Sequence, residues 1–356
     1  MMKQMAFYDI LQLDPAVLKV HIKQAETRAE RRRFQWGLFL RALFIVAFAV
    51  AFIASLNALF GSENSAMSVA IFCILLAVRF VDFNYCMQDA LRNLVIVFLL
   101  LCFAPLVAQS LPLPGAILVH TVALFVIFMM TCDQPEMGNS GLFGFSYVFL
   151  AGNPVQGDAL EARFLMTCVG ILICGWVYLR KYKGKHANVP FSARWQVFDF
   201  CEQKYQWQVR MALGIGIILA VGAAVQLERF VWAAFAVSSI LTDHRMGSGI
   251  QDKSSHRLIG VLIGTMLFYL VYSFVPPSLY VLLGPIGGFC LGFCGAYLSK
   301  TVFNCFGALI MGASIYGLEG SVMLRISDTL IGVVFALGFY YLFNLLTVRL
   351  WRTCPD

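Results

Sequence analysis

Long apolar runs separated by short polar stretches are the dominant pattern of this chain. After a mixed-charge start we count twelve such runs, at residues 38–60, 64–80, 91–109, 114–132, 141–152, 160–180, 209–226, 229–242, 256–275, 278–298, 301–317 and 322–347. A straight helix needs about 20 apolar residues to cross the hydrocarbon core of a bilayer. The pattern therefore predicts an all-α polytopic membrane protein with about twelve transmembrane helices. The second, fifth, eighth and eleventh runs are short, so they are either spans with polar ends or broken and re-entrant helices.

Arginines at the edges of these runs recur in the two halves of the chain. Arg79 and Arg245 each stand at the end of the second apolar helix of their half, and Arg163 and Arg325 each stand at the start of the sixth. The offset is about 165 residues in both cases, which indicates an internal repeat of the kind found in transporters. Because six spans return the chain to its starting side, we predict two parallel six-helix repeats related by a pseudo-twofold axis along the membrane normal.

Charge distribution sets the predicted topology. Lys and Arg gather near the N-terminus, around the middle of the chain and in loops on the same predicted side, which the positive-inside rule assigns to the cytoplasm. The predicted parts are a cytoplasmic or interfacial amphipathic lead-in (1–37), a first six-helix repeat (38–181), a cytoplasmic linker (182–208), a second six-helix repeat (209–348) and a cytoplasmic tail (349–356). We expect a multi-pass protein of the cell plasma (inner) membrane with both termini in the cytoplasm.

Composition excludes a soluble core and argues against nucleic-acid binding. Hydrophobic residues make up 60% of the chain and charged residues only 13%, against about 25% charged in soluble domains. The net charge of +7 follows helix ends and lacks the aromatic interleaving of a nucleic-acid groove. The 11 cysteines show no metal-binding spacing, and no catalytic motif is present, so we expect neither a cofactor nor enzymatic activity.

The paired arginines are the main candidates for substrate binding. Arg79 and Arg245 either mark topology or form a two-guanidinium mouth that binds carboxylates bidentately. Arg163 and Arg325 lie on the predicted outer side, where they would line the outer part of an anion path. Arg257, at the start of an apolar run, is instead interpreted as reaching toward cytoplasmic headgroups, as are Arg41, Arg92 and Arg210.

Three further residues have both a structural and a functional interpretation. Asp328 follows Arg325 by one helical turn, and it either neutralises that arginine locally or titrates during proton coupling. His120 lies well inside an apolar run, as a hydrogen-bonded core residue or as a proton relay or ligand contact. Trp232 belongs either to an aromatic belt or to a vestibule for planar substrates.

Three stretches resemble a known family. VWAAFAV from Val231, HRLIGVLIGTML from His256 and RISDTLIGVVFAL from Arg325 resemble the fusaric acid resistance (FUSC-like) superfamily. This superfamily includes aromatic acid exporters, and its membrane part is similar to that of plant aluminium-activated malate transporters. The resemblance implies that Trp232, Arg257, Gly260 and Gly264 form one family motif and that Arg325, Asp328 and Gly332 form a second.

The sequence therefore predicts an exporter of small organic anions, aromatic acids among them, with a basic path between the two repeats and coupling to protons. A passive organic-anion channel and a non-transporting membrane scaffold or lipid-handling protein are the alternatives. The expected partners are the anion substrate and membrane lipids, and no nucleic acid. A homodimer and, in a Gram-negative cell, a periplasmic adaptor are further candidates.

Overall fold

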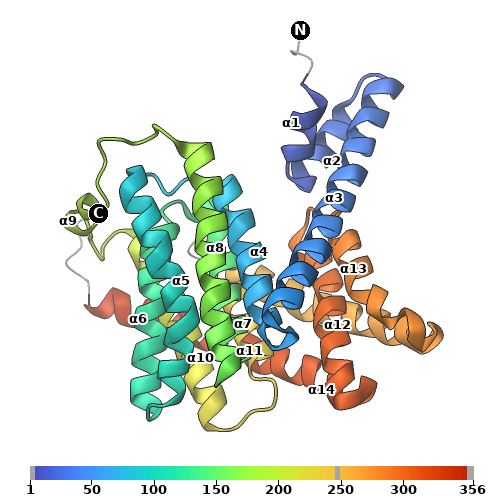
Figure 1. Ribbon diagram of the computed structural model, residues 1–356. Helices are drawn as coiled ribbons and strands as arrows, with labels where there is room; N and C mark the ends of the chain where they lie inside the picture. The colour runs from blue at the N-terminus through green and yellow to red at the C-terminus, as the bar shows by residue number, and fades with distance from the viewer. Residues whose placement is uncertain (1–4, 245–248, 351–356) are drawn as a thin grey trace. The chain divides into compact units, whose positions relative to one another are not determined.

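The computed structural model of the chain describes residues 5–244 and 249–350, and the regular structure of these residues is helical (Figure 1). The α-helices are α1 (Phe7–Gln12), α2 (Pro15–Gln24), α3 (Arg28–Phe60), α4 (Ser65–Phe80), α5 (Met87–Gln109), α6 (Leu113–Thr131), α7 (Asn139–Ala151), α8 (Asp158–Tyr182), α9 (Ser192–Gln196), α10 (Gln203–Ala224), α11 (Val231–Leu241), α12 (Gly249–Phe274), α13 (Tyr280–Leu291) and α14 (Tyr297–Leu350). Short 3-10 turns precede α4, α7 and α13 at Ser62–Asn64, Pro135–Met137 and Pro277–Leu279.

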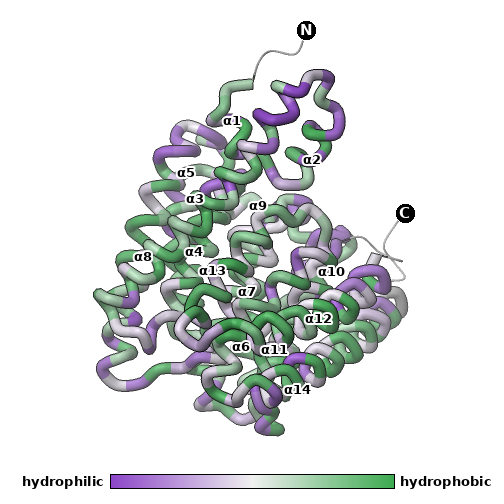
Figure 2. The backbone as a smooth tube through the Cα atoms, turned by 90° about the vertical axis from the view of Figure 1, so that its right-hand side faces the viewer, coloured by the Kyte–Doolittle hydropathy of each residue, from purple (hydrophilic) through white to green (hydrophobic). Residues whose placement is uncertain are grey.

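Eight helices among the described residues are long and apolar enough to cross a membrane, and α11 and α13 are shorter apolar helices. The prediction of an all-α, polytopic membrane protein is therefore confirmed. Figure 2 shows hydrophobic colour along these helices, with hydrophilic segments concentrated near the N-terminus and at helix ends. The predicted twelve spans and their arrangement as two repeats stay predictions.

The longest helix, α14, is broken by a glycine. Gly317 has φ 70° and ψ 173°, a left-handed conformation that side chains other than hydrogen rarely adopt. The break falls where the sequence separates the last two apolar runs, 301–317 and 322–347. At about 1.5 Å per residue, either segment beside the break is long enough to span a bilayer.

The chain forms two compact units that each combine distant segments. Unit 1 comprises Met1–Ala51 and Asp252–Thr329, and unit 2 comprises Phe52–Gln251 and Leu330–Asp356. Each unit thus takes helices from both predicted repeats: α12 shares unit 1 with most of α3, and α10 shares unit 2 with α4–α8. The boundaries that we predicted along the sequence, such as those of the two six-helix repeats, divide the chain differently from these units, and they stay predictions.

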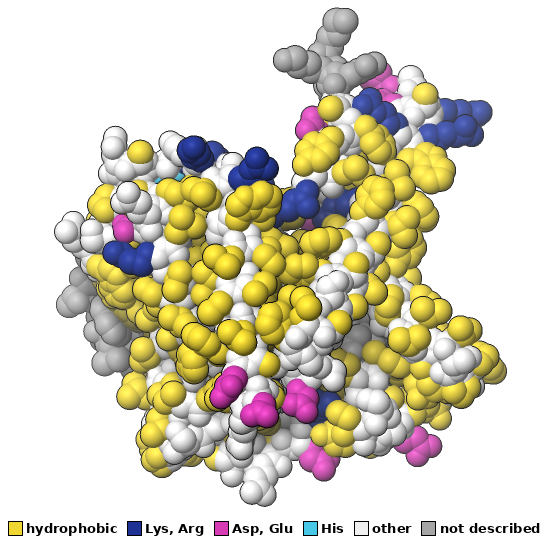
Figure 3. Space-filling view, viewed as in Figure 1, with side chains coloured by type: hydrophobic (Ala, Val, Ile, Leu, Met, Phe, Trp, Pro, Cys, Tyr) yellow, Lys and Arg dark blue, Asp and Glu magenta, His cyan; other side chains and the backbone are white. Residues whose placement is uncertain are grey.

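Unit 2 is a bundle in which α10 packs along α6, α4 packs against α7 and α8, and α5 packs against α6 and α8. Gly216 permits the approach of α10 to α6, because a Cβ there would lie 3.0 Å from the backbone nitrogen of Thr121. Helix α8 carries acids in its first turn and Arg180 and Lys181 in its last, which complements the helix dipole. Figure 3 shows this separation, with dark-blue and magenta side chains at opposite ends of this unit.

Unit 1 begins with a small helical cluster on α3. Ile10 and Leu18, from α1 and α2, pack with Phe34 and Leu38 in one buried apolar core. Asp14 caps α2 by accepting a hydrogen bond from the backbone nitrogen of Ala16 at 2.8 Å. The described part of the lead-in therefore contains two short helices that pack on the start of α3.

A set of polar contacts fastens the linker to the loops of unit 2. Asp133, just after α6, accepts from Arg194 at 3.1 Å and from Lys204 at 3.2 Å, and we call these three residues the linker clasp. Asn84 adds a 3.2 Å hydrogen bond to the same carboxylate. Burial by itself would raise the pKa of Asp133, but Arg194, Asn84 and Lys204 outweigh it, so that the pKa is lowered.

The clasp predicts a loss of stability in acid. Because the folded-state pKa of Asp133 is lowered from 3.8, its contribution is present above that value and is lost as the pH falls through the lower folded value. We expect the unfolding temperature of the wild-type protein to fall as the pH is lowered from about 5 toward 3. Asp133→Asn should already be less stable at pH 7 and should show a shallower acid dependence. Thermal unfolding in detergent measures both, with the exposed Glu63→Gln as control. An unchanged slope in Asp133→Asn would contradict a role for the clasp.

Candidate functional site

Two buried arginines and one buried aspartate meet within unit 1. Arg257 lies on α12, and Arg325 and Asp328 lie on α14 after its break at Gly317. Their exposed fractions are 5%, 3% and 1%. Arg325 is hydrogen-bonded to Cys305 and interacts electrostatically with both Arg257 and Asp328. We call Arg257, Arg325 and Asp328 the twin-arginine cluster.

Close helix packing holds this cluster in place. Gly260 and Gly264, both on α12, lie directly against α14. A Cβ on Gly260 would lie 2.8 Å from Thr301 Cβ, and one on Gly264 would lie 2.9 Å from Cys305 Sγ and overlap the backbone of Val302. These glycines allow the backbones to approach as small residues do in membrane helices. The spacing of Arg325 and Asp328 puts both on one face of α14.

The charges of the cluster do not balance. The cluster holds two guanidiniums and one carboxylate, and the Nε of Arg257 has no hydrogen-bond partner among the described residues. Burying an uncompensated charge costs several kcal/mol, and the partner that best offsets it for a guanidinium is a bidentate carboxylate. The cluster is therefore chemically suited to an organic anion.

Arg163 is compensated differently, within unit 2. Its Nε donates to the side-chain oxygen Oδ1 of Asn64 at 3.0 Å. The side-chain nitrogen Nδ2 of Asn64 donates in turn to the backbone carbonyls of Phe60 and Ala159 at 3.1 and 3.0 Å. Arg163 is 1% exposed, and its Nη2 has no partner among the described residues. Asn64 is therefore the fixed acceptor that orients this guanidinium.

The remaining predicted substrate residues do not gather with these. Arg79 is exposed at the end of α4, with its guanidinium 5.5 Å from the Phe80 ring, and Arg245 lies outside the described residues. Trp232 is 4% exposed, with Arg229 5.9 Å above its ring. The mouth predicted from Arg79 and Arg245 stays a prediction, as do the substrate roles of Arg163, Arg325 and Trp232.

The headgroup interpretation of Arg257 and Arg210 is wrong, because both side chains are buried. Arg210 is 0% exposed, donates to the backbone carbonyl of Asp243 at 2.8 Å and lies 4.8 Å from the Tyr340 ring. The family motif contains Arg257, and this was the sequence signal that could have placed it beside Arg325. Arg92 keeps a surface position, with a 64% exposed side chain and a 3.1 Å ion pair to Asp89.

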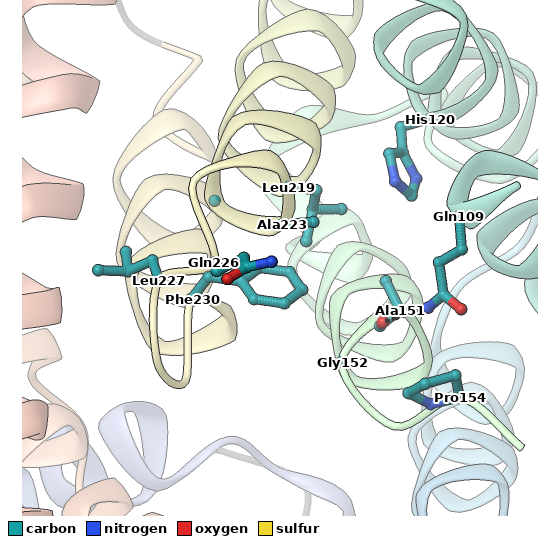
Figure 4. A pocket seen from close by; sticks show the side chains of 11 residues that line it. Gln109, His120, Ala151, Gly152, Pro154, Leu219, Ala223, Gln226, Leu227 and Phe230 are labelled. Carbon is teal, nitrogen blue, oxygen red and sulfur yellow. Dashed lines mark hydrogen bonds between the residues drawn. The ribbon is translucent and has the colours of Figure 1, made fainter. Parts of the chain in front are cut away.

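A pocket of about 300 Å³ lies at the ends of α5, α7 and α10 in unit 2 (Figure 4). Its lining residues are Gln109, His120, Ala151, Gly152, Pro154, Leu219, Gly222, Ala223, Gln226, Leu227 and Phe230. His120, from α6, is 5% exposed, and its Nδ1 lies 2.9 Å from the hydroxyl of Tyr147. The sequence alternatives for His120 thus both retain support, since it is hydrogen-bonded in the core and also lines a cavity.

Residues 216–339 match the family model described as fusaric acid resistance protein-like. This stretch runs from α10 into α14 and contains the whole twin-arginine cluster. The predicted FUSC-like resemblance is therefore confirmed, while the likeness to plant malate transporters stays a prediction. No curated protein and no solved structure matches the chain. The fold is that of a multi-pass membrane protein, and over residues 216–339 the chain is similar to the fusaric acid resistance protein-like family.

Asn64 provides a direct test of how Arg163 is held. Asn64→Leu removes the acceptor at 3.0 Å and leaves the guanidinium buried, so the free energy of unfolding should fall by about 2–3 kcal/mol. Chemical unfolding in detergent measures this loss. Asn64→Leu combined with Arg163→Met should recover much of it, because the orphaned charge is then gone. A double variant less stable than Asn64→Leu alone would contradict the pairing.

Proposed function

We propose that this protein exports small organic anions, including aromatic carboxylates, and that the substrate carboxylate binds at the twin-arginine cluster. The observation that carries the proposal is the burial of Arg257, Arg325 and Asp328 in one cluster, in which Arg325 interacts with both of the other residues. A bound anion supplies the second negative charge and accepts hydrogen bonds from donors such as the Nε of Arg257. The match to a transporter family over the same residues supports it.

Asp328 gives this site a means of coupling to protons. The substrate and Asp328 compete for the same guanidiniums, so binding of the anion favours the protonated form of the carboxyl group. Release of the anion favours ionisation, and Asp328 then occupies the guanidiniums itself. Outward movement of one anion is thereby linked to movement of one proton.

The other predicted residues have places in the same scheme. Arg79 and Arg245 attract anions at the cytoplasmic side, and Arg163 and Trp232 belong to the outer part of the path. The protein lies in the plasma (inner) membrane with both termini in the cytoplasm, an orientation that the basic end of α8 supports through Arg180 and Lys181. A homodimer or a periplasmic adaptor would complete the assembly.

Anion flux through proteoliposomes tests the binding proposal. We expect efflux of labelled benzoate from vesicles containing the wild-type protein, and a loss of at least about tenfold in Arg257→Met and Arg325→Met, the order expected when a charge-assisted hydrogen bond is removed. Arg325→Lys should keep partial activity, because the charge stays while the bidentate geometry is lost. Arg92→Met, which removes an exposed arginine, is the matched control and should transport normally. Normal transport by folded Arg257→Met would overturn the proposal.

Coupling is tested by varying the pH gradient across the same vesicles. In the wild type, an outwardly directed proton gradient should accelerate benzoate efflux, since each anion leaves together with the proton bound at Asp328. Asp328→Asn cannot exchange this proton, and its residual flux should not respond to the gradient. A passive channel behaves differently, because its current reverses at the anion equilibrium potential whatever the pH gradient. Wild-type flux that ignores the proton gradient would contradict coupling.

A further inference from the structure

We propose that the pocket beside His120 is a second binding site, for a small uncharged molecule that accepts hydrogen bonds. The site is separate from the twin-arginine cluster, since all of its lining residues belong to unit 2. It does not depend on the proposed transport function. Its ligand class follows from the size, walls, polar groups and charge of the pocket.

Size restricts the ligand to about one ring. The pocket volume of about 300 Å³ is at the lower end of ligand sites, and a cavity of about 150 Å³ already accepts benzene. A single ring with one polar substituent therefore fits.

The pocket walls are formed by the ends of α10 and α7, which pack closely against the start of α11. A Cβ on Gly222 would lie 2.7 Å from Phe230 Cβ, and one on Gly152 would lie 3.1 Å from Val231 Cβ. The ends of α10 and α7 thus press against the start of α11, and Phe230 is held at the pocket wall. Figure 4 shows Phe230 facing Pro154 and Ala151 across this space. The pocket is formed where α5, α6, α7 and α10 meet the start of α11.

The hydrogen bond between Tyr147 and His120 leaves the Nε2 proton of His120 as the donor that we assign to the ligand. The hydroxyl of Tyr147 is fully buried, and its hydrogen-bond partner among the described residues is the Nδ1 of His120 at 2.9 Å. The phenol donates to this nitrogen, since a buried hydroxyl without an acceptor is costly, and the imidazole proton then sits on Nε2. Figure 4 shows the imidazole at the pocket with Gln109 on the same side. Gln109 donates its amide to the Ala151 carbonyl at 3.3 Å, which keeps its own carbonyl oxygen for other donors.

The absence of charged side chains among the lining residues makes both anions and cations unfavourable ligands. None of the residues that line the pocket is Lys, Arg, Asp or Glu. His120 accepts a hydrogen bond from the Tyr147 hydroxyl at Nδ1 and so carries no charge in this arrangement, and a charged ligand would lose its hydration without a counter-charge. The preferred ligand is consequently an uncharged ring that bears an amide or similar acceptor.

Benzamide and benzoate provide a matched pair of probes, because they share size and shape and differ in charge. With the full-length protein in lipid nanodiscs, equilibrium dialysis of labelled benzamide should give saturable binding with a dissociation constant on the order of 1 mM. Ala223→Phe should weaken binding at least tenfold, because its ring fills the pocket from α10. Ala224→Phe, at the adjacent exposed position, is the control and should bind normally.

Further measurements separate this site from the transport proposal. His120→Leu should also weaken benzamide binding, while excess benzoate at pH 7.5 should not displace benzamide from the wild type. Benzoate efflux should be unchanged in Ala223→Phe, so the two proposals succeed or fail independently. Equal benzamide binding by Ala223→Phe and Ala224→Phe, or displacement of benzamide by benzoate at similar concentrations, would overturn the inference.

Discussion

The cost of placing a guanidinium among apolar helices constrains this protein more than any other interaction. A charged arginine at the centre of a bilayer is unfavourable by at least about 2.5 kcal/mol, and each buried arginine therefore needs a defined partner. Arg210 uses a backbone carbonyl and the face of Tyr340, and Arg163 uses the side chain of Asn64. Arg325 instead interacts electrostatically with both Arg257 and Asp328. The first two arrangements use neutral acceptors and leave guanidinium nitrogens of Arg163 and Arg210 without a partner among the described residues, whereas the third cluster contains a carboxylate.

Charged groups outside the apolar helices serve a different purpose. The linker clasp joins an aspartate after α6 to cations on either side of α10's start, and further contacts attach the linker to the α4–α5 loop. Such pairs lie where water can solvate them, so they contribute to folding without creating an unbalanced buried charge. The pocket beside His120 shows a third arrangement, in which polar groups are neutral and satisfied by one another.

The sequence predicted the helices well, because an apolar run of sufficient length has few alternatives in a membrane protein. It also located the interruption in α14 that Gly317 produces. It could not predict that α1 and α2 pack back on α3 through Ile10 and Leu18, since short amphipathic segments give no indication of their partner. The interpretation of Arg257 failed for a related reason. An arginine at a helix end looks the same in sequence whether it reaches headgroups or turns into a cluster, and only the approach of α12 to α14 decides. The pocket depends on four helix ends meeting, which no local pattern encodes.

Anomalous diffraction from crystals soaked with 4-bromobenzoate tests the central claim most directly, since bromine can be located without reference to the side chains. The account predicts a bromine peak beside the twin-arginine cluster, with the carboxylate of the ligand between the guanidiniums of Arg257 and Arg325. Loss of that peak in crystals of Arg257→Met would complete the result. A cluster sealed by dry side-chain packing, with bromine found only at other places on a protein that still transports the compound, would contradict the account.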